Sequence, residues 1–186
     1  MVGAVGRLFL AADLSADTRR ALLAKLEDLL SRMPGRRVPP PNWHLTMRFL
    51  GDVDRVSYEK LVYELSEADL GSPFGVTFGN PGAFPRPARA TVLWLGIDRG
   101  EERLVLVADR VEEAVLRAGF PPEDRPFRAH LTLSRIRPPE NVNALLDGRE
   151  PLGVKTQIEA VTLFRSHLGP AGATYEALDT FPLTKA

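Results

Sequence analysis

Apolar residues recur every three or four positions in four segments of the chain, and this spacing predicts helices. The predicted helices cover residues 16–33, 57–68 and 101–118, with a short one over residues 140–146. Proline or glycine follows the first and the third of them, as is expected where a helix ends.

Runs that are short and apolar, or that alternate apolar with polar residues, predict strands between these helices. The predicted strands cover residues 7–12, 44–50, 74–78, 91–97, 127–136, 158–164 and 174–178. Gly51 and Asp52 are expected to end the second of them. Because helices are interleaved among strands that hold alternating patterns, we expect an α+β domain with antiparallel or mixed sheets.

The absence of certain features narrows the class of protein. No apolar run approaches the roughly 18 residues that a membrane-spanning helix needs. Arg7 interrupts the mildly apolar segment Met1–Ala12, which we therefore interpret as a strand and not as a signal peptide. The 186 residues include no cysteine, which excludes disulfides, thiolate nucleophiles and cysteine zinc sites. We expect a cytoplasmic protein without membrane contact.

The charge of the chain limits how it can meet nucleic acid. Lys and Arg together number 24, and Asp and Glu also number 24, so the chain is formally neutral. A protein that coats nucleic acid non-specifically is normally basic, so any contact with RNA should be local. Neither common type of glycine-rich phosphate loop is present, which argues against nucleoside-triphosphate chemistry.

The most informative feature is an internal repeat. His44-Leu-Thr-Met47 recurs as His130-Leu-Thr-Leu133, and each copy follows a proline-rich segment and leads into an apolar strand. In a strand, residues two positions apart share a face. The His and Thr of each copy should therefore lie on one face, with the apolar residues of each copy directed into the core. If the two strands lie side by side about a pseudo-two-fold axis, both pairs converge on one cleft.

Two imidazoles and two hydroxyls in one cleft suit cleavage of a phosphodiester without a metal ion. A neutral histidine can take a proton from the attacking oxygen, and a protonated one can give a proton to the leaving oxygen. Threonine hydroxyls can hydrogen-bond the non-bridging oxygens of the transition state. The imidazoles would titrate as a coupled pair, which predicts a bell-shaped pH profile.

Three arginines near the motifs could add positive charge. In a regular strand Arg48 lies on the face of His44, and Arg128 lies on the face of His130. Arg135 falls on the opposite face from His130. It can reach the cleft only if the strand ends or bulges near Ser134.

Several longer segments carry a resemblance to a known family. They are Arg7–Ala11, Asn42–Gly51, Thr91–Gly96, Phe120–Arg135 and Phe164–Pro170, and together they span essentially the whole chain. With its paired His-x-Thr-x motifs, the sequence resembles the two-histidine phosphoesterase superfamily. More narrowly, it resembles the bacterial and archaeal RNA 2',3'-cyclic phosphodiesterases, which are also called 2'-5' RNA ligases.

The resemblance implies a fold, a site and an activity. It implies one two-lobed domain over residues 1–186, with pseudo-symmetric lobes, helices packed outside antiparallel or mixed sheets, and a central active-site cleft. The catalytic residues would be His44 and His130, and the substrate-binding residues Thr46, Thr132 and Arg135, with no metal and no cofactor.

The implied reaction hydrolyses a 2',3'-cyclic phosphate to a 2'-phosphate end. His130 would activate water and His44 would protonate the departing 3' oxygen, although the pseudo-symmetry leaves the reverse assignment open. The implied partners are RNA ends or nucleoside 2',3'-cyclic phosphates, contacted locally by a monomer.

Three other functions stay open on the sequence. The same cleft could join or cut 2'-5' linkages in RNA, or the chain could bind RNA ends without catalysis. A metal hydrolase is less favoured, because no metal-ligand spacing surrounds the three histidines. His167 lacks a following Thr and is expected to be structural or at the rim of the cleft. Phe9, Phe49 and Trp94 could stack on a base, but we expect them in the core.

Overall fold

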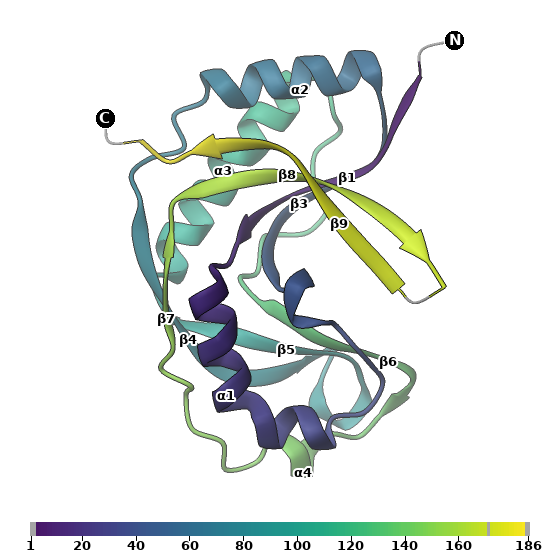
Figure 1. Cartoon of the computed structure of the whole chain (residues 1–186), viewed down its shortest axis with the longest axis vertical. Coiled ribbons are helices and arrows are strands. Elements are labelled where there is room, and N and C mark those ends of the chain that lie inside the picture. The colour runs from purple at the N-terminus through teal and green to yellow at the C-terminus, as the bar shows by residue number, and fades with distance from the viewer. Residues whose placement is uncertain (1–2, 171, 185–186) are drawn as a thin grey trace.

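The computed structural model of the protein describes residues 3–170 and 172–184 and shows an α+β fold (Figure 1). Its strands are β1 (Ala4–Asp13), β2 (Arg36–Arg37), β3 (His44–Asp54), β4 (Phe74–Phe84), β5 (Ala90–Arg99), β6 (Leu131–Glu140), β7 (Lys155–Ile158), β8 (Ala160–Gly169) and β9 (Gly172–Pro182). Its α-helices are α1 (Ala16–Arg32), α2 (Arg55–Glu67), α3 (Glu101–Arg117) and α4 (Asn143–Leu146), and its 3-10 helices are η1 (Pro40–Asn42) and η2 (Pro87–Arg89).

Polar caps fix where the first two helices begin. Ser15 precedes α1, and its side chain accepts a hydrogen bond from the backbone N–H of Thr18. Asp54 does the same for Ser57 at the start of α2. Such caps satisfy N–H groups that have no partner inside the helix. None of the helices in the described residues is long and apolar enough to cross a membrane.

The sheet has two halves that meet at the motif strands. In the part of the chain that the structure describes, the strand order is β7-β4-β5-β6-β3-β1-β8-β9, with β2 added beside β6, and every pairing is antiparallel. One residue pair, Leu45 with Leu131, joins β3 to β6 and so joins the halves. The predicted α+β class with antiparallel sheets is confirmed.

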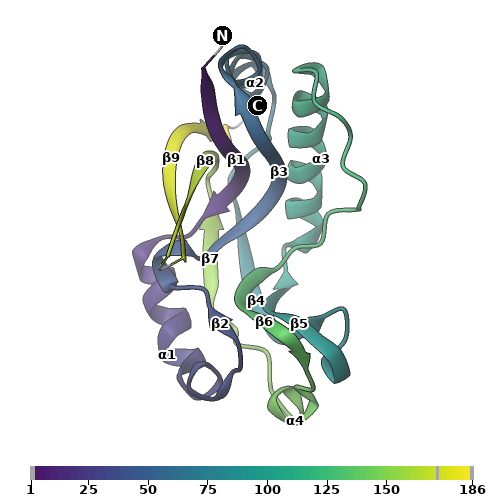
Figure 2. The same ribbon diagram turned by 90° about the vertical axis from the view of Figure 1, so that its right-hand side faces the viewer.

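Helices cover the outside of this curled sheet. α2 and α3 pack against each other, α3 lies against β3, and α2 contacts β1, β3 and β9. Figure 2 shows α3 along one side of the molecule and the β8–β9 hairpin on the other. The N-terminal part of α1 is tied to β7, because the Thr18 hydroxyl donates to that of Thr156 over 2.8 Å.

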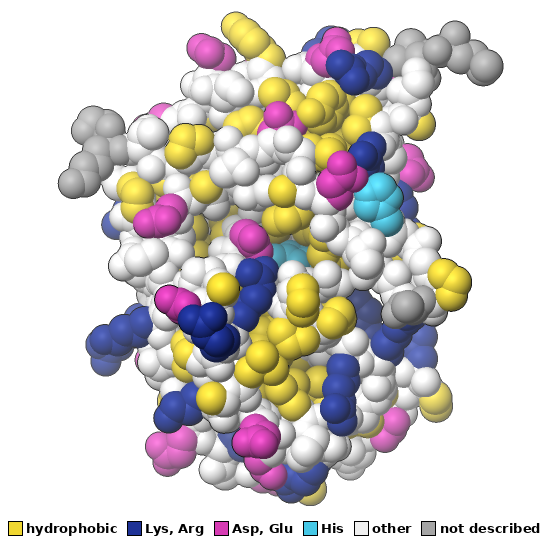
Figure 3. All heavy atoms as spheres, viewed as in Figure 1, with side chains coloured by type: hydrophobic (Ala, Val, Ile, Leu, Met, Phe, Trp, Pro, Cys, Tyr) yellow, Lys and Arg dark blue, Asp and Glu magenta, His cyan; other side chains and the backbone are white. Residues whose placement is uncertain are grey.

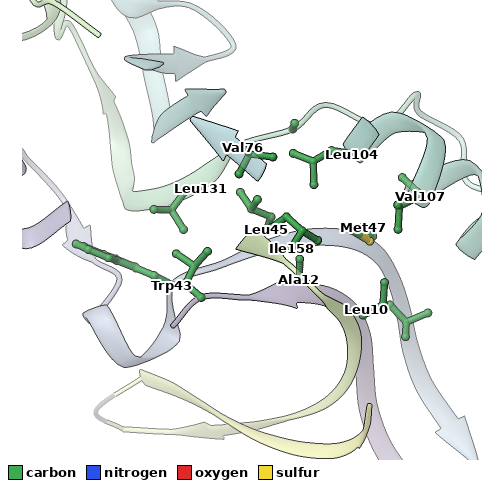
Figure 4. Close-up of a cluster of buried hydrophobic side chains, with 14 of the residues drawn as sticks. Leu10, Ala12, Trp43, Leu45, Met47, Val76, Leu104, Val107, Leu131 and Ile158 are labelled. Atoms are coloured by element: carbon green, nitrogen blue, oxygen red, sulfur yellow. The ribbon is translucent and has the colours of Figure 1, made fainter. Parts of the chain in front are cut away.

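The two motif strands contribute their leucines to the main core. Leu45 and Leu131 are both fully buried, and Val76, Leu104 and Ile158 surround them (Figure 4). The core thus runs from one half of the sheet to the other beneath the junction. Since apolar burial contributes about 25 cal/mol per Å², this shared core holds the halves in place more firmly than the single ladder contact does.

Several element boundaries differ from those that the sequence predicts. Gly51 does not end its strand. It adopts φ +72° and pairs with Leu8, and β3 continues beside β1 as far as Asp54. The strand predicted over 158–164 is two strands, β7 and β8. β6 begins only at Leu131, so Phe127–His130 is not strand. The two-residue strand β2 carries no apolar pattern and was not predicted.

A β-bulge in β3 makes the interpretation of Arg48 wrong. Leu10 pairs with Arg48 and Ala11 with Thr46, so Met47 is an extra residue in β3. The bulge shifts the alternation by one. Arg48 is therefore buried on the core side, where its Nε donates to Glu112 over 2.7 Å and its Nη1 to Glu123 over 2.8 Å.

This burial gives Arg48 a structural role that can be measured. We expect Arg48→Ala to lower the free energy of unfolding by about 2 kcal/mol. The carboxylates of Glu112 and Glu123 lose their cationic partner, and the missing side chain leaves a buried cavity. The value is below that for a fully enclosed pair, since both glutamates are partly exposed. Urea unfolding followed by circular dichroism would measure it. Arg7→Ala, at an exposed position, should change stability by less than about 0.5 kcal/mol. Equal stability of the two variants would contradict the structural role.

Candidate active site

The register at the sheet junction brings the two motifs together. In an antiparallel pair, the residue before one partner lies beside the residue after the other. With Leu45 opposite Leu131, His44 therefore lies beside Thr132, and Thr46 beside His130. The leucines are buried, whereas these four side chains are half-buried on the other face. The alternation predicted for the motifs is confirmed, and Figure 3 shows one histidine recessed among hydrophobic side chains in the middle of the molecule.

Backbone carbonyls orient both imidazoles in the same way. His44 Nδ1 lies 2.7 Å from the carbonyl oxygen of Asn42, and His130 Nδ1 lies 2.7 Å from that of Arg128. Because a carbonyl only accepts, the proton of each neutral ring is assigned to Nδ1. Each Nε2 then carries a lone pair toward the site. Thr46 Oγ1 is 2.8 Å from Nε2 of His44 and can donate to it.

Arg19 braces the segment in front of His44, a role that no sequence pattern predicts. From α1 its side chain donates to the carbonyl oxygens of Pro40 and Trp43, both over 2.9 Å, and to that of Leu14. These bonds hold the segment that supplies the carbonyl partner of His44. No sequence signal marks this role, because the carbonyls of Pro40 and Trp43 come from a segment more than twenty residues away.

Both imidazoles favour the neutral form. Burial lowers the pKa of His44 to about 4, and the Asn42 carbonyl opposes this only in part. Burial also lowers the pKa of His130, and the charges of Arg135 and Arg128 add to that effect. The positive charge of Arg135 lowers the pKa of His44 as well.

Arg135 meets the geometric condition that the sequence analysis set for it. Leu93 pairs with Ser134 and Trp94 with Thr132, so Leu133 is the extra residue of a bulge in β6. The bulge restores Arg135 to the face of Thr132, and its side chain is exposed there. The structure therefore brings together all five residues that the sequence analysis placed in the site.

Aromatic side chains line the His44 side of the site. Phe9, Phe164 and Tyr175 form a small cluster separate from the main core, with ring centroids of Phe9 and Tyr175 at 4.9 and 5.3 Å from that of His44. Phe9 is buried, as expected, but Phe49 is 58% exposed, so its assignment to the core is wrong. The bulge at Met47 that buries Arg48 turns Phe49 outward.

A cavity of about 380 Å³ opens beside His44. Its lining is mainly apolar and includes part of η1, the start of α1 and the β8–β9 hairpin. The lining residues are Asp13, Ala16, Arg19, Pro41, Asn42, Trp43, His44, Phe164, Tyr175 and Ala177.

The His130 side carries its own aromatic pair. Phe84 meets His130 edge to face at 5.2 Å, and the guanidinium of Arg128 lies over the same phenyl ring at 5.3 Å. Trp94 lies flat on Gly82, where a Cβ would come within 2.4 Å of the indole. Trp94 is only partly buried, and its Nε1 has no hydrogen-bond partner among the described residues.

The third histidine lies outside this group. His167 is exposed on β8, and its Nε2 is 2.7 Å from Glu176, which also binds Arg165. This agrees with the structural or rim position predicted for it. Across residues 3–170 and 172–184, no three His, Asp or Glu side chains are grouped as metal ligands would be.

Comparison with known proteins identifies the family. A family model described as "LigT like Phosphoesterase" matches the chain twice, over residues 13–94 and 95–175. The chain belongs to the LigT-like phosphoesterase family. Each match contains one His-x-Thr-x motif, so the internal repeat is a repeat of the LigT-like unit itself, and the two-lobed fold follows from it.

Relatives of this LigT-like chain match over nearly their full length. It is 31% identical over 177 residues to the RNA 2',3'-cyclic phosphodiesterase of Archaeoglobus fulgidus, covering 94% of this chain and 99% of the relative. It is 32% identical over 187 residues to that of Methanothermobacter thermautotrophicus, covering 95% and 98%. The solved structure of E. coli LigT complexed with 3'-AMP superposes with a TM-score of 0.77 at 26% identity, covering 98% and 100%.

The pKa directions and the ring orientation can be tested in the free protein. We expect long-range ¹H–¹⁵N NMR to show both rings neutral at pH 7, with the proton on Nδ1, because each Nδ1 faces a carbonyl. His44 should gain a proton only near pH 4, and His130 below its ordinary value of 6.5. His44→Gln and His130→Gln would assign the signals. A pKa of 6.5 or more for either ring, or a proton on Nε2, would contradict the arrangement.

Proposed function

We propose that this chain hydrolyses 2',3'-cyclic phosphates at RNA ends to 2'-phosphomonoesters, without a metal ion, through His44 and His130. The observation that carries the proposal is the pairing of Leu45 with Leu131, because it assembles two imidazoles and two hydroxyls on one face. The relatives named RNA 2',3'-cyclic phosphodiesterase support it, since they match over most of the chain.

Each group has a role in the proposed reaction. The lone pair on Nε2 of His130 takes a proton from water, whose oxygen attacks phosphorus. The bond from phosphorus to the 3' oxygen breaks, and protonated His44 gives its proton to that oxygen. The products are a 2'-phosphate and a 3'-hydroxyl. Thr46 and Thr132 hydrogen-bond the non-bridging oxygens, and Arg135 balances their charge.

The hydrogen bonding of the free protein supports His130 as the base. Its Nε2 makes no hydrogen bond within residues 3–170 and 172–184, so the lone pair is available to water. Nε2 of His44 lies within 2.8 Å of Thr46 Oγ1. Once His44 is protonated, Nε2 becomes a donor and can turn from Thr46 to the leaving oxygen. The reverse assignment remains the alternative, because the two motifs are pseudo-symmetric and because burial lowers the pKa of His44 to about 4, which favours a neutral His44 in the free protein.

The reaction can be identified from its product. We expect the protein to convert a nucleoside 2',3'-cyclic phosphate, and a short RNA ending in one, to the 2'-phosphate with excess EDTA present. Phosphorus NMR distinguishes the 2'- from the 3'-phosphate. A 3'-phosphate would reverse the direction of attack, and loss of activity with EDTA would point to a metal. Absence of turnover would favour 2'-5' linkage chemistry or binding alone.

The three histidines provide a matched set of variants. We expect His44→Ala and His130→Ala each to lower kcat/KM by about 10²- to 10⁴-fold, the usual contribution of a general acid or base. His167→Ala is the control and should retain activity, because that side chain is exposed and pairs with Glu176. Circular dichroism would verify that all three variants fold. Full activity in either motif variant would remove that residue from the mechanism.

The lowered pKa values predict where activity is highest. Catalysis needs one proton on the histidine pair, and kcat/KM reports the free protein. Because both pKa values lie below 6.5, we expect kcat/KM for a nucleoside 2',3'-cyclic phosphate to be highest below pH 6.5 and to fall above it. In His44→Ala the residual activity should lose this alkaline fall if His44 is the acid. A maximum above pH 7.5 would contradict the lowered values.

A further inference from the structure

Two arginines face each other across the short strand β2. Arg36 on β2 pairs directly with Arg135 on β6, so their side chains project from the same face of the sheet. Like charges directly opposite each other are destabilising. Both side chains are exposed, and neither lies within 4.0 Å of a carboxylate in the described part of the chain. Such a pair is typical of a site whose counter-charge comes from a ligand.

The local structure holds the two arginines in this position. A Cβ on Gly35 would lie 2.5 Å from the carbonyl oxygen of Arg135, and Gly35 has φ +82°, so only glycine lets β2 approach so closely. The buried hydroxyl of Ser134 donates to the carbonyl oxygen of Pro34 over 2.6 Å. Close packing and a buried hydrogen bond thus maintain a repulsive pairing.

The guanidinium of Arg36 extends from β2 to the β8–β9 hairpin. A Cβ on Gly172, the first residue of β9, would lie 2.7 Å from its Nη2. The same end of the hairpin is fixed to η1, because Asn42 Nδ2 donates to the carbonyl oxygen of Ala173 over 2.7 Å. Tyr175 on this hairpin feels the charge of Arg135. Arg36 therefore reaches from the strand beside Arg135 to the hairpin that carries Tyr175, one strand farther from the histidines.

Arg36 and Arg135, which have no carboxylate partner among the described residues, lie on the His130 side of the site. Arg19, on the His44 side, is paired with Asp13. By the internal repeat, Phe49 occupies the position of Arg135, and the His44 side is lined with aromatic rings. A cyclic phosphate has a single phosphorus, which Arg135 with the two threonines suffices to hold. Arg36 is thus a second cation, displaced from the first toward β9. Arginine binds phosphate oxygens through two parallel N–H donors, so each guanidinium can hold one phosphate.

We propose that Arg36 binds the phosphodiester immediately 5' of the reacting cyclic phosphate, and so selects RNA ends over single nucleosides. This inference rests on the proposed function. It gives a formally neutral chain a local contact with the RNA backbone, one phosphate long. Arg36 is a substrate-binding residue and takes no part in proton transfer.

Two substrates separate this contact from the chemistry. A nucleoside 2',3'-cyclic phosphate lacks the second phosphate, whereas a short RNA with the same 3'-terminal base has it. We expect Arg36→Ala to lower the ratio of kcat/KM for the RNA to kcat/KM for the nucleoside about tenfold, the size of one charge-assisted contact. Raising the salt concentration should lower kcat/KM for the RNA less steeply in Arg36→Ala, by about 0.7 in the log–log slope.

Arg37→Ala is the matched control. Arg37 is the next residue, pairs with Ser134, and donates from Nη2 to the carbonyl oxygen of Ser31 over 3.3 Å, on the opposite face of β2. Arg37→Ala removes the same charge as Arg36→Ala, but the ratio of kcat/KM for the RNA to kcat/KM for the nucleoside should stay unchanged. An unchanged ratio in Arg36→Ala, including equal losses on both substrates, would overturn the proposal. The same fall of the ratio in Arg37→Ala would also overturn it.

Binding tests the subsite separately from the activity. Fluorescence anisotropy of a labelled RNA ending in a 2',3'-cyclic phosphate can be measured in a His130→Ala background, where turnover is suppressed. Adding Arg36→Ala should raise Kd about tenfold, and adding Arg37→Ala should not. If the unsubstituted protein turns over neither substrate, the proposed function fails, and this measurement still decides the subsite. Equal Kd values for His130→Ala with and without Arg36→Ala would overturn the proposal.

Discussion

The pairing of Leu45 with Leu131 is the constraint on which the rest of this structure depends. It is the single residue pair that joins the two halves of the sheet, and both side chains are fully buried in a core that the halves share. A shift of one residue in either strand would turn the leucines outward and the histidines into the core. The packing of two apolar residues thereby fixes four polar ones on the opposite face. The stability of the junction and the composition of the site have the same cause.

Each motif ends in a bulge, and the side chains that follow the two bulges make a pseudo-symmetric frame chemically asymmetric. Arg48 and Ser134 occupy equivalent positions and are both buried, whereas Phe49 and Arg135 are both exposed. One side of the site therefore presents an aromatic ring and the other a cation. A nucleotide end is asymmetric in the same sense, with an aromatic base on one side of the ribose and a charged backbone on the other. The repeat places one imidazole in each lobe. The difference between Phe49 and Arg135 at the equivalent position makes the two sides of the site chemically different, so that an asymmetric ligand would bind in one orientation.

The sequence predicts the parts of this structure that depend on local pattern. The His-x-Thr alternation, the three long helices and the α+β class can be read from spacing alone. The bulges cannot, because Met47, the extra residue in β3, is an apolar residue between Thr46 and Arg48 and so continues the alternating pattern. For this reason the alternation predicts the wrong face for Arg48, and Phe49 is exposed where a core position is expected. β2 and the Arg19 brace depend on contacts with distant backbone carbonyls, for which no residue pattern exists.

The burial that assembles the site also sets its protonation. In the free protein both imidazoles are desolvated and lie near Arg135, so their neutral forms are favoured, and most strongly at His44. Acid–base catalysis by a pair needs one proton between them, and a cyclic phosphate brings a negative charge beside both rings. An anion at this distance raises the pKa of a neighbouring imidazole and offsets the charge of Arg135. In the proposed mechanism, binding of the substrate therefore favours the protonation state that its own cleavage requires. A ligand without that charge would leave the pair neutral, so under the proposed mechanism the need for a proton would itself favour phosphate esters.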